Sequence, residues 1–217
     1  MARLLSSQLE YWASAAKQYH KALPGSAAEH YLMTERGLSR DSLVFSRLGF
    51  VESPVSGHEK YEGCMSIPYL TKAGVAGVRF RRLGDGTGPK YMSEEGGETR
   101  LYNTPDFFRH ERFICLCEGE IDALTAHQAG LPAVAVPGCK AWKGFMARCF
   151  DGYEAVFILA DTDDKKGDGM KFAETAASQI KTARIVPMKH AGVGMDVNTF
   201  VNELGPQALI EKLGVEL

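Results

Sequence analysis

The second half of the chain alternates short apolar runs with helical patterns, and this alternation limits the possible folds more than any other sequence feature. The apolar runs read as buried strands, and they lie within residues 113–117, 132–138, 155–161 and 183–188. The helical patterns occupy residues 120–130, 141–150, 169–181 and 206–213. Strands that alternate with helices predict an α/β fold, with a four-stranded, mostly parallel sheet flanked by helices.

The first half of the chain has a different pattern. Its first 50 residues have helical character, and Ser26 with Glu29 forms a capping-box pattern at the start of a second helix. Ser39 is in position to cap a third helix. Residues 64–70 and 75–83 are strand-like and are separated by a short turn, which predicts a β-hairpin. The first half is therefore expected to be a mixed α/β subdomain.

Charge divides the chain at the same place. Residues 1–112 contain 15 Lys and Arg against 13 Asp and Glu, a net charge of +2, whereas residues 113–217 contain 10 against 14, a net charge of −4. We therefore expect a basic N-terminal subdomain over residues 1–112 and an acidic domain with a C-terminal helix over residues 113–217. Carboxylates concentrated in one domain suit an enzyme that binds divalent metal, because the metal offsets part of their charge.

Cysteine usage and hydropathy indicate the compartment. Five cysteines without repeated spacing argue against a disulfide framework and favour a reducing cytoplasm. Cys115 and Cys117 have no second pair nearby, so no zinc site is expected. The sequence contains no run of 18 apolar residues and no secretory leader, so neither a membrane span nor a membrane partner is expected.

Acidic, amide and glycine residues follow the predicted strands, where each strand ends. They are Glu118 and Gly119 with Asp122, then Gly138, then Asp161 and Asp163, and finally Asp196 with Asn198. The carboxyl ends of parallel strands meet at one rim, where ligands bind. Hard oxygen ligands suit Mg²⁺ or Mn²⁺, and without metal such a cluster repels itself. Any one of these carboxylates could instead be a helix cap or a solvated charge.

Two of these segments resemble a known family. CEGEIDALTAHQAG, residues 117–130, and ILADTDDKKGDGMKFAETA, residues 158–176, resemble the TOPRIM domain that primases, topoisomerases and some nucleases share. The resemblance implies that Glu118, Asp161 and Asp163 bind metal and that Asp122 supports them. It also implies that Gly119 allows close backbone approach and that Gly138 forms the turn after the second strand.

Other segments resemble the DnaG-type primases within that family. Residues 65–103 are similar to their N-terminal subdomain and residues 194–213 to their tail motif, so the match runs from about residue 26 to 214. The resemblance implies a platform for template and nucleotide, and Asp196 and Asn198 as further metal ligands. The matching platform positions are Arg81 and Lys90 with Tyr91, and Arg79 shares a strand face with Arg81. A charged edge strand is the alternative reading of these basic residues.

The resemblance also implies an activity. We expect DNA-templated synthesis of short RNA primers on single-stranded DNA from NTPs, with two or more Mg²⁺ or Mn²⁺ ions and no zinc. The chain departs from the family in a longer loop after Asp163, which includes Asp164 and Lys165, and in Asn198, which stands where the family has an acid. The family's zinc ribbon is not matched, so we expect a small phage-type primase that works with a replicative helicase or a separate zinc-ribbon protein.

Two other functions remain open at this point. A TOPRIM nuclease would use the same metal cluster to direct water onto a phosphodiester, although it has no need of the primase-like first half. A non-catalytic nucleic-acid-binding replication subunit would not need intact carboxylates.

Overall fold

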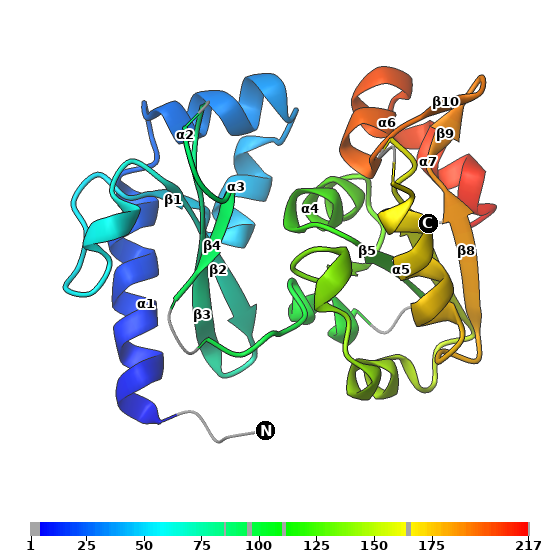
Figure 1. Ribbon diagram of the computed structural model, residues 1–217, viewed down its shortest axis with the longest axis horizontal. Helices are drawn as coiled ribbons and strands as arrows, with labels where there is room; N and C mark the ends of the chain where they lie inside the picture. The colour runs from blue at the N-terminus through cyan, green and yellow to red at the C-terminus, as the bar shows by residue number, and fades with distance from the viewer. Residues whose placement is uncertain (1–4, 85, 95–96, 110–111, 164–165, 217) are drawn as a thin grey trace. The chain divides into compact units, whose positions relative to one another are not determined.

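The computed structural model divides into two compact units, Met1–Glu98 and Thr99–Leu217, which we call the first and second units (Figure 1). The structure describes residues 5–84, 86–94, 97–109, 112–163 and 166–216. The division lies before the segment 99–112, which the sequence pattern had assigned to the first half. The reason is that this segment bonds to a strand of the second unit, as described below.

The first unit is a long helix packed on an antiparallel sheet, with two short helical segments at one end. The sheet order is β1-β2-β3-β4, and each neighbouring pair is antiparallel. Its strands are β1 (Gly49–Phe50), β2 (Met65–Thr71), β3 (Gly74–Arg81) and β4 (Tyr91–Ser93). The predicted hairpin is confirmed as β2 and β3, which are joined through Lys72 and Ala73.

Helix α1 (Ser6–Lys21) covers this sheet with small and aromatic side chains. Ala15, Ala16 and Tyr19 are buried against Phe80 of β3 and its neighbours. The backbone of α1 also comes very close to β1, because a Cβ added to Gly49 would lie 2.5 Å from the carbonyl carbon of Tyr19. Glycine at this position therefore sets the spacing between helix and sheet.

The remaining helices of the first unit begin where the capping residues predict. The Ser26 side chain accepts a hydrogen bond from the backbone N–H of Glu29 at the start of α2 (Ala27–His30). Helix α2 continues into a π-helical turn, η1 (Tyr31–Glu35). The Ser39 side chain accepts from the N–H of Ser42 and caps α3 (Arg40–Ser46).

The second unit confirms the predicted parallel α/β fold. Its sheet order is β6-β5-β7-β8, and all three neighbouring pairs are parallel. The strands are β5 (Phe113–Cys117), β6 (Ala133–Ala135), β7 (Ala155–Ala160) and β8 (Ala183–Pro187). All six residues of β7 are buried, as expected for a strand covered on both faces.

Helices cover the sheet of the second unit on both faces. Helix α4 (Glu120–Gln128) connects β5 to β6, and α5 (Asp168–Ala177) connects β7 to β8. Because β6 and β8 lie at opposite edges, right-handed crossovers place these two helices on opposite faces. The core under α5 is formed by Phe172, Ala173 and Ala176 with Ile114 and Ile158.

The structure differs from the predicted pattern in two places. Residues 141–150 do not form the predicted α-helix. They belong to two 3-10 segments, η4 (Cys139–Ala141) and η5 (Gly144–Phe150), which the extended residues Trp142 and Lys143 separate. The segment after β8 contains a small hairpin, β9 (Lys189–His190) and β10 (Val193–Gly194). A further helix, α6 (Val197–Leu204), precedes the predicted α7 (Pro206–Leu213).

The segment that precedes β5 is bonded to the outer edge of β6. Tyr102 and Ala135 exchange two backbone hydrogen bonds, of 2.8 and 3.2 Å. The Asn103 side chain donates to the carbonyl of Ala133 (2.8 Å), and the buried Asp106 carboxylate accepts from the N–H of Ala133 (2.8 Å). These bonds assign the segment to the second unit.

In the part of the chain that the structure describes, no helix is both long and apolar enough to cross a membrane.

Candidate functional site

The sheet of the second unit has a topological switch point between β5 and β7. These strands are neighbours, but the chain leaves β5 toward β6 on one side and leaves β7 toward β8 on the other. In open parallel sheets, ligands bind at the carboxyl ends of the strands where the chain directions diverge. Glu118 directly follows β5 and Asp161 directly follows β7, so both stand at this point.

Four other carboxylates gather around Asp161. Burial, followed by the negative charges of Asp122, Glu118, Asp196 and Asp163 in that order, raises the pKa of Asp161 from 3.8 to about 10. Asp161 Oδ1 is also buried and has no hydrogen-bond partner among the described residues. The structure therefore brings all five predicted acidic residues close enough to act on one another, and it leaves one buried oxygen available for a ligand. We call these residues the carboxylate cluster.

The Glu118 side chain lies beside the turn that follows β6. The N–H of Gly138 donates to the backbone carbonyl of Glu118 (3.0 Å), and Gly138 has a φ of 105°, which favours glycine. The neighbouring Cys139 thiol contacts the Glu118 carboxylate. Burial, followed by the charge of Glu118, raises the pKa of the Cys139 thiol.

The first turn of α5 packs directly against the cluster. A Cβ added to Gly169 would lie 2.5 Å from the Asp161 carbonyl oxygen and 3.1 Å from Glu118 Oε2. Glycine therefore allows the N-terminal end of α5 to approach both acidic residues. The partial positive charge of a helix N-terminus offsets part of their repulsion.

Asp122 lies in the first turn of α4 and is 8% exposed. A Cβ added to Gly119 would lie 2.7 Å from Asp122 Oδ2, so Gly119 makes room for this carboxylate. Asp122 Oδ1 accepts the backbone N–H of Asn198 (3.1 Å). The Asn198 side chain donates to Thr125 Oγ1 (2.8 Å) and accepts from Asn202 (3.4 Å). Asn198 thus connects α6 to α4, and its amide is engaged within the protein.

The loop before α6 is locked to the loop after β7 through Thr162. The Thr162 N–H donates to the Met195 carbonyl (3.0 Å), and its hydroxyl donates to the Met188 carbonyl (2.5 Å). A Cβ added to Gly194 would overlap the Thr162 carbonyl oxygen. Asp196 follows this contact, and its side chain caps α6 by accepting from the N–H of Thr199 (2.6 Å). Asp164 and Lys165 lie outside the described residues.

The residues present fit a hard divalent cation. The cluster offers carboxylate oxygens, which Mg²⁺ and Mn²⁺ prefer, and the raised pKa of Asp161 reflects negative charge that a cation would offset. Within the described ranges, no three His, Cys, Asp or Glu side chains already stand in the arrangement of a metal site. The carboxylate side chains must therefore move when an ion binds, because without the ion they repel one another.

Basic and aromatic side chains alternate on one face of the first unit. The Arg81 guanidinium carbon lies 4.1 Å from the ring centre of Tyr31 and 5.7 Å from that of Tyr91. The Arg79 guanidinium carbon lies 5.4 Å from the ring centre of Tyr91, and Arg79 Nε donates to Ser93 Oγ (3.2 Å). We call Tyr31, Arg81, Tyr91 and Arg79 the arginine–tyrosine ladder. Arg79 and Arg81 therefore share a face, as the strand period predicts.

The members of this basic face differ in exposure. Arg81 is only 4% exposed, and its Nε has no hydrogen-bond partner among the described residues. Lys90, directly before β4, is exposed. Arg82 instead donates to the carbonyls of Thr87 and Gly88, which stabilises the glycine-rich loop. Lys90 is therefore exposed to solvent and ligands, whereas Arg79 is half-buried.

Several residues of the site were missed by sequence reasoning. Gly169 and Gly194 permit close approach to the cluster, Cys139 contacts Glu118, and Thr162 joins the two loops. The two glycines were detectable in part, since each stands next to a predicted acidic loop. The roles of Cys139 and Thr162 depend on contacts between distant segments, which the sequence alone does not reveal.

Comparison with known proteins agrees with this geometry. Residues 115–201 match the sequence model of a Toprim-like family. The chain is 44% identical over 158 residues to the Gene 57 protein of Mycobacterium phage D29, an alignment that covers 70% of this chain and 99% of the phage protein.

Solved structures share the fold along almost the whole chain. The Aquifex aeolicus primase, which includes zinc-binding and RNA polymerase domains, superposes with a TM-score of 0.77 at 21% identity over 98% of this chain. This chain spans 62% of that longer protein. A DnaG primase catalytic domain bound to single-stranded DNA superposes with a TM-score of 0.72 at 19% identity, covering 96% of this chain and 78% of that one. The chain is thus a homologue of a phage protein and itself has the fold of the DnaG-type primase catalytic core. It therefore belongs to the TOPRIM family.

Proposed function

We propose that this protein is a DNA primase, which joins nucleotides into short RNA primers on a single-stranded DNA template. The observation that carries the proposal is the carboxylate cluster at the switch point of a DnaG-type fold. A buried carboxyl whose pKa is raised by four acidic neighbours destabilises the protein unless a ligand uses it. Such a cluster is therefore best explained as a site for cations and the phosphates that cations bind.

In this proposal, Glu118, Asp161 and Asp163 hold Mg²⁺ or Mn²⁺. The bound ions would lower the charge on a triphosphate and favour ionisation of a primer hydroxyl. The charge of Asp122 acts on Asp161, and its carboxylate accepts a hydrogen bond from the Asn198 N–H. In the proposal, Asp122 therefore positions the metal-binding carboxylates. Asp196 contributes its charge from the opposite loop. In the proposal, Glu118 would also accept a proton from the attacking hydroxyl.

The arginine–tyrosine ladder and Lys90 supply the nucleic-acid and nucleotide contacts of the proposal. Arg79 and Lys90 would contact phosphates, and Arg81 would hold Tyr91 in position between them. Support comes from the DnaG domain of the same fold, which was solved with single-stranded DNA. Sequence-independent contact of this kind combines basic groups with aromatic rings on which bases stack.

The test is primer synthesis by the purified full chain. Single-stranded DNA, labelled NTPs and Mg²⁺ or Mn²⁺ are incubated with the protein, and the products are separated by length. Short RNA that depends on template and metal, and that disappears in the Asp161→Asn variant, supports the proposal. Asp151→Asn, an exposed acid of the same unit outside the cluster, is the matched control and retains activity.

The same reactions distinguish the alternatives. If end-labelled DNA is shortened and no RNA forms, the carboxylate cluster belongs to a nuclease. If the protein binds DNA but neither synthesis nor cleavage is detected with either metal, it is a binding subunit. Either result contradicts the primase proposal.

A further inference from the structure

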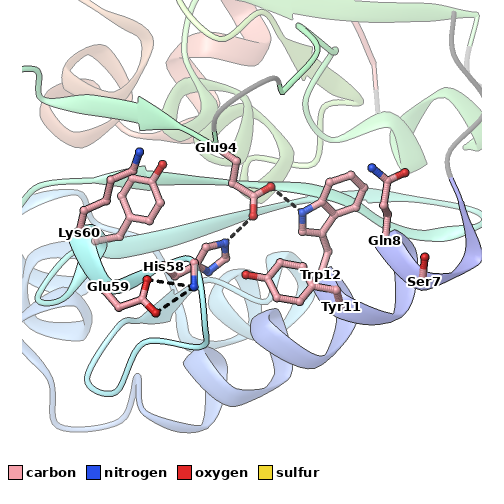
Figure 2. Close-up of a pocket in the computed structure, with 10 residues that line it drawn as sticks. Ser7, Gln8, Tyr11, Trp12, His58, Glu59, Lys60 and Glu94 are labelled. Carbon is pink, nitrogen blue, oxygen red and sulfur yellow. Dashed lines mark hydrogen bonds and ion pairs between the residues drawn. The ribbon is translucent and has the colours of Figure 1, made fainter.

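The first unit contains a pocket of about 640 Å³ that the proposed reaction does not use (Figure 2). Its walls come from the start of α1, from the loop Gly57–Tyr61 and from Glu94, which follows β4. The volume is within the range of about 300–1,000 Å³ typical of ligand pockets. The carboxylate cluster belongs to the other unit, so the two sites have no residue in common.

A carboxylate is held rigidly inside this pocket. Glu94 Oε2 accepts the indole N–H of Trp12 (2.5 Å), and Glu94 Oε1 is bonded to His58 Nε2. His58 is 1% exposed, and its Nδ1 is bonded to the Tyr19 hydroxyl (2.9 Å). A buried chain of hydrogen bonds therefore fixes Glu94 before any ligand arrives. A carboxylate has about four acceptor positions, and these contacts use two of them.

Aromatic rings stand beside this carboxylate. Figure 2 shows Trp12 and Tyr11 next to Glu94, with Tyr11 on the His58 side. Tyr11 is 37% exposed, and its hydroxyl donates to the Ser56 carbonyl (2.8 Å), which fixes the ring. Its ring meets that of His58 edge to face, at 5.4 Å. Rigid aromatic faces beside a carboxylate are the arrangement that binds organic cations, and guanidinium groups in particular.

The charge at the pocket also favours a cation. Burial, followed by nearby charges that include those of Glu94 and Glu59, raises the pKa of Tyr11 to about 12. The same electrostatic field that disfavours a phenolate favours a bound cation. Two acids and one lysine line the pocket, so we expect phosphates to bind it less well than cations. Lys60 lies over the ring of Tyr61, on the opposite side of Glu94 from Trp12 in Figure 2.

We propose that this pocket binds an arginine side chain from a basic segment of a partner protein. The guanidinium would donate to the Glu94 carboxylate and lie near Glu59, and its aliphatic stem would pack on Trp12 and Tyr11. The negative charges of Glu94 and Glu59 favour a basic partner. Because hydrogen bonds already hold Glu94 in place, binding costs little conformational entropy at this side chain.

The experiment follows the indole N–H signals of the full chain by NMR. The chain has two tryptophans, Trp12 and Trp142, so a Trp142→Phe variant assigns the two signals. The probe is the blocked tripeptide acetyl-Gly-Arg-Gly-amide, and the matched control peptide has citrulline, a neutral analogue of the same shape, in place of arginine. We expect the arginine peptide to shift the Trp12 signal with a Kd in the millimolar range, while the Trp142 signal stays in place.

Variants test which groups produce the binding. Glu94→Gln is expected to weaken it about tenfold, and Glu59→Gln and Tyr11→Leu are expected to weaken it less. Glu62→Gln, which changes an exposed acid outside the pocket, should leave it unchanged. Unchanged backbone amide signals from the sheet of the first unit show that each variant is folded. The proposal is overturned if the arginine peptide leaves Trp12 unmoved, if citrulline acts equally well, or if a single-stranded oligonucleotide shifts Trp12 more strongly.

Discussion

Each unit buries an ionisable side chain, but the two units accommodate it in different ways. Arg81 in the first unit is 4% exposed and lies between the rings of Tyr31 and Tyr91. Burial and the surrounding acidic groups raise the pKa of Asp161 in the second unit to about 10, so without a cation this carboxyl keeps its proton at neutral pH. The first charge is stabilised by the protein itself, through the electron-rich faces of the rings. The Asp161 carboxyl becomes a stable carboxylate only when a cation offsets the negative charge around it. A charge that the fold compensates indicates a structural or positioning role, whereas an uncompensated one marks a ligand site.

The largest expected effect is the loss of activity when a metal-binding carboxylate of the cluster is removed. Asp161→Asn or Glu118→Gln should lower primer synthesis about 1,000-fold, because electrostatic stabilisation of transferring phosphoryl groups contributes several kcal/mol. Labelled-NTP incorporation at fixed Mg²⁺ measures it, and Asp151→Asn serves as the control. Activity near that of the wild type in a folded Asp161→Asn variant would remove the cluster from the mechanism.

The compensated charge should matter for stability instead. Arg81→Ala should lower the free energy of unfolding by about 2 kcal/mol, since the guanidinium is stacked between two rings away from water. Arg79→Ala, at the more exposed end of the same ladder, should cost about 0.5 kcal/mol. Urea denaturation of the two variants measures the difference. Equal costs would show that burial does not distinguish these two arginines.

Replacing Asp161 should change the free energy of unfolding in the opposite direction from replacing Arg81. The raised pKa of Asp161 means that the native state holds this proton more tightly than the unfolded state does. Its contribution to stability is therefore complete below about pH 4 and is lost as the pH rises toward 10. Without metal, Asp161→Asn should stabilise the protein by at least about 1 kcal/mol near neutral pH, or about 2–4 °C in Tm. The gain should shrink toward pH 4.

Thermal unfolding in a chelator at pH 5 and pH 8 measures this gain. Mg²⁺ or Mn²⁺ should then raise the Tm of the wild type more than that of Asp161→Asn. A variant that is less stable than the wild type at pH 8 would show that the acidic neighbours do not strain the native state.

The smallest expected effect concerns the basic residues that would contact phosphates. Arg79→Ala and Lys90→Ala should each reduce the slope of log K against log salt for single-stranded DNA by about 0.7, one phosphate contact per residue. Lys72→Ala, in the turn between β2 and β3, is the control. Unchanged slopes in both variants would leave these residues as a charged edge strand.

The sequence predicted the sheet of the second unit well because its strands are short, apolar and separated by clear helical patterns. It also led to the expectation that the acidic residues after these strands lie near one another, and in the structure four of them are close enough to act on Asp161. It did not predict that Asn198 bonds to Thr125 or that Thr162 joins two loops, because those contacts depend on how α6 packs against α4. The burial of Arg81 was not predictable either, since its ring partner Tyr31 lies 50 positions earlier in the chain.

The bonds between residues 102–106 and β6 have a consequence for self-association. Ala133 and Ala135 direct their backbone groups to the outer edge of the sheet, where another chain could add a strand. All four groups are already bonded: those of Ala135 by Tyr102, and those of Ala133 by Asn103 and Asp106. A fragment that began at Phe113, at the start of β5, would uncover this edge. Such a fragment should aggregate, whereas one that began at Thr99 should stay monodisperse.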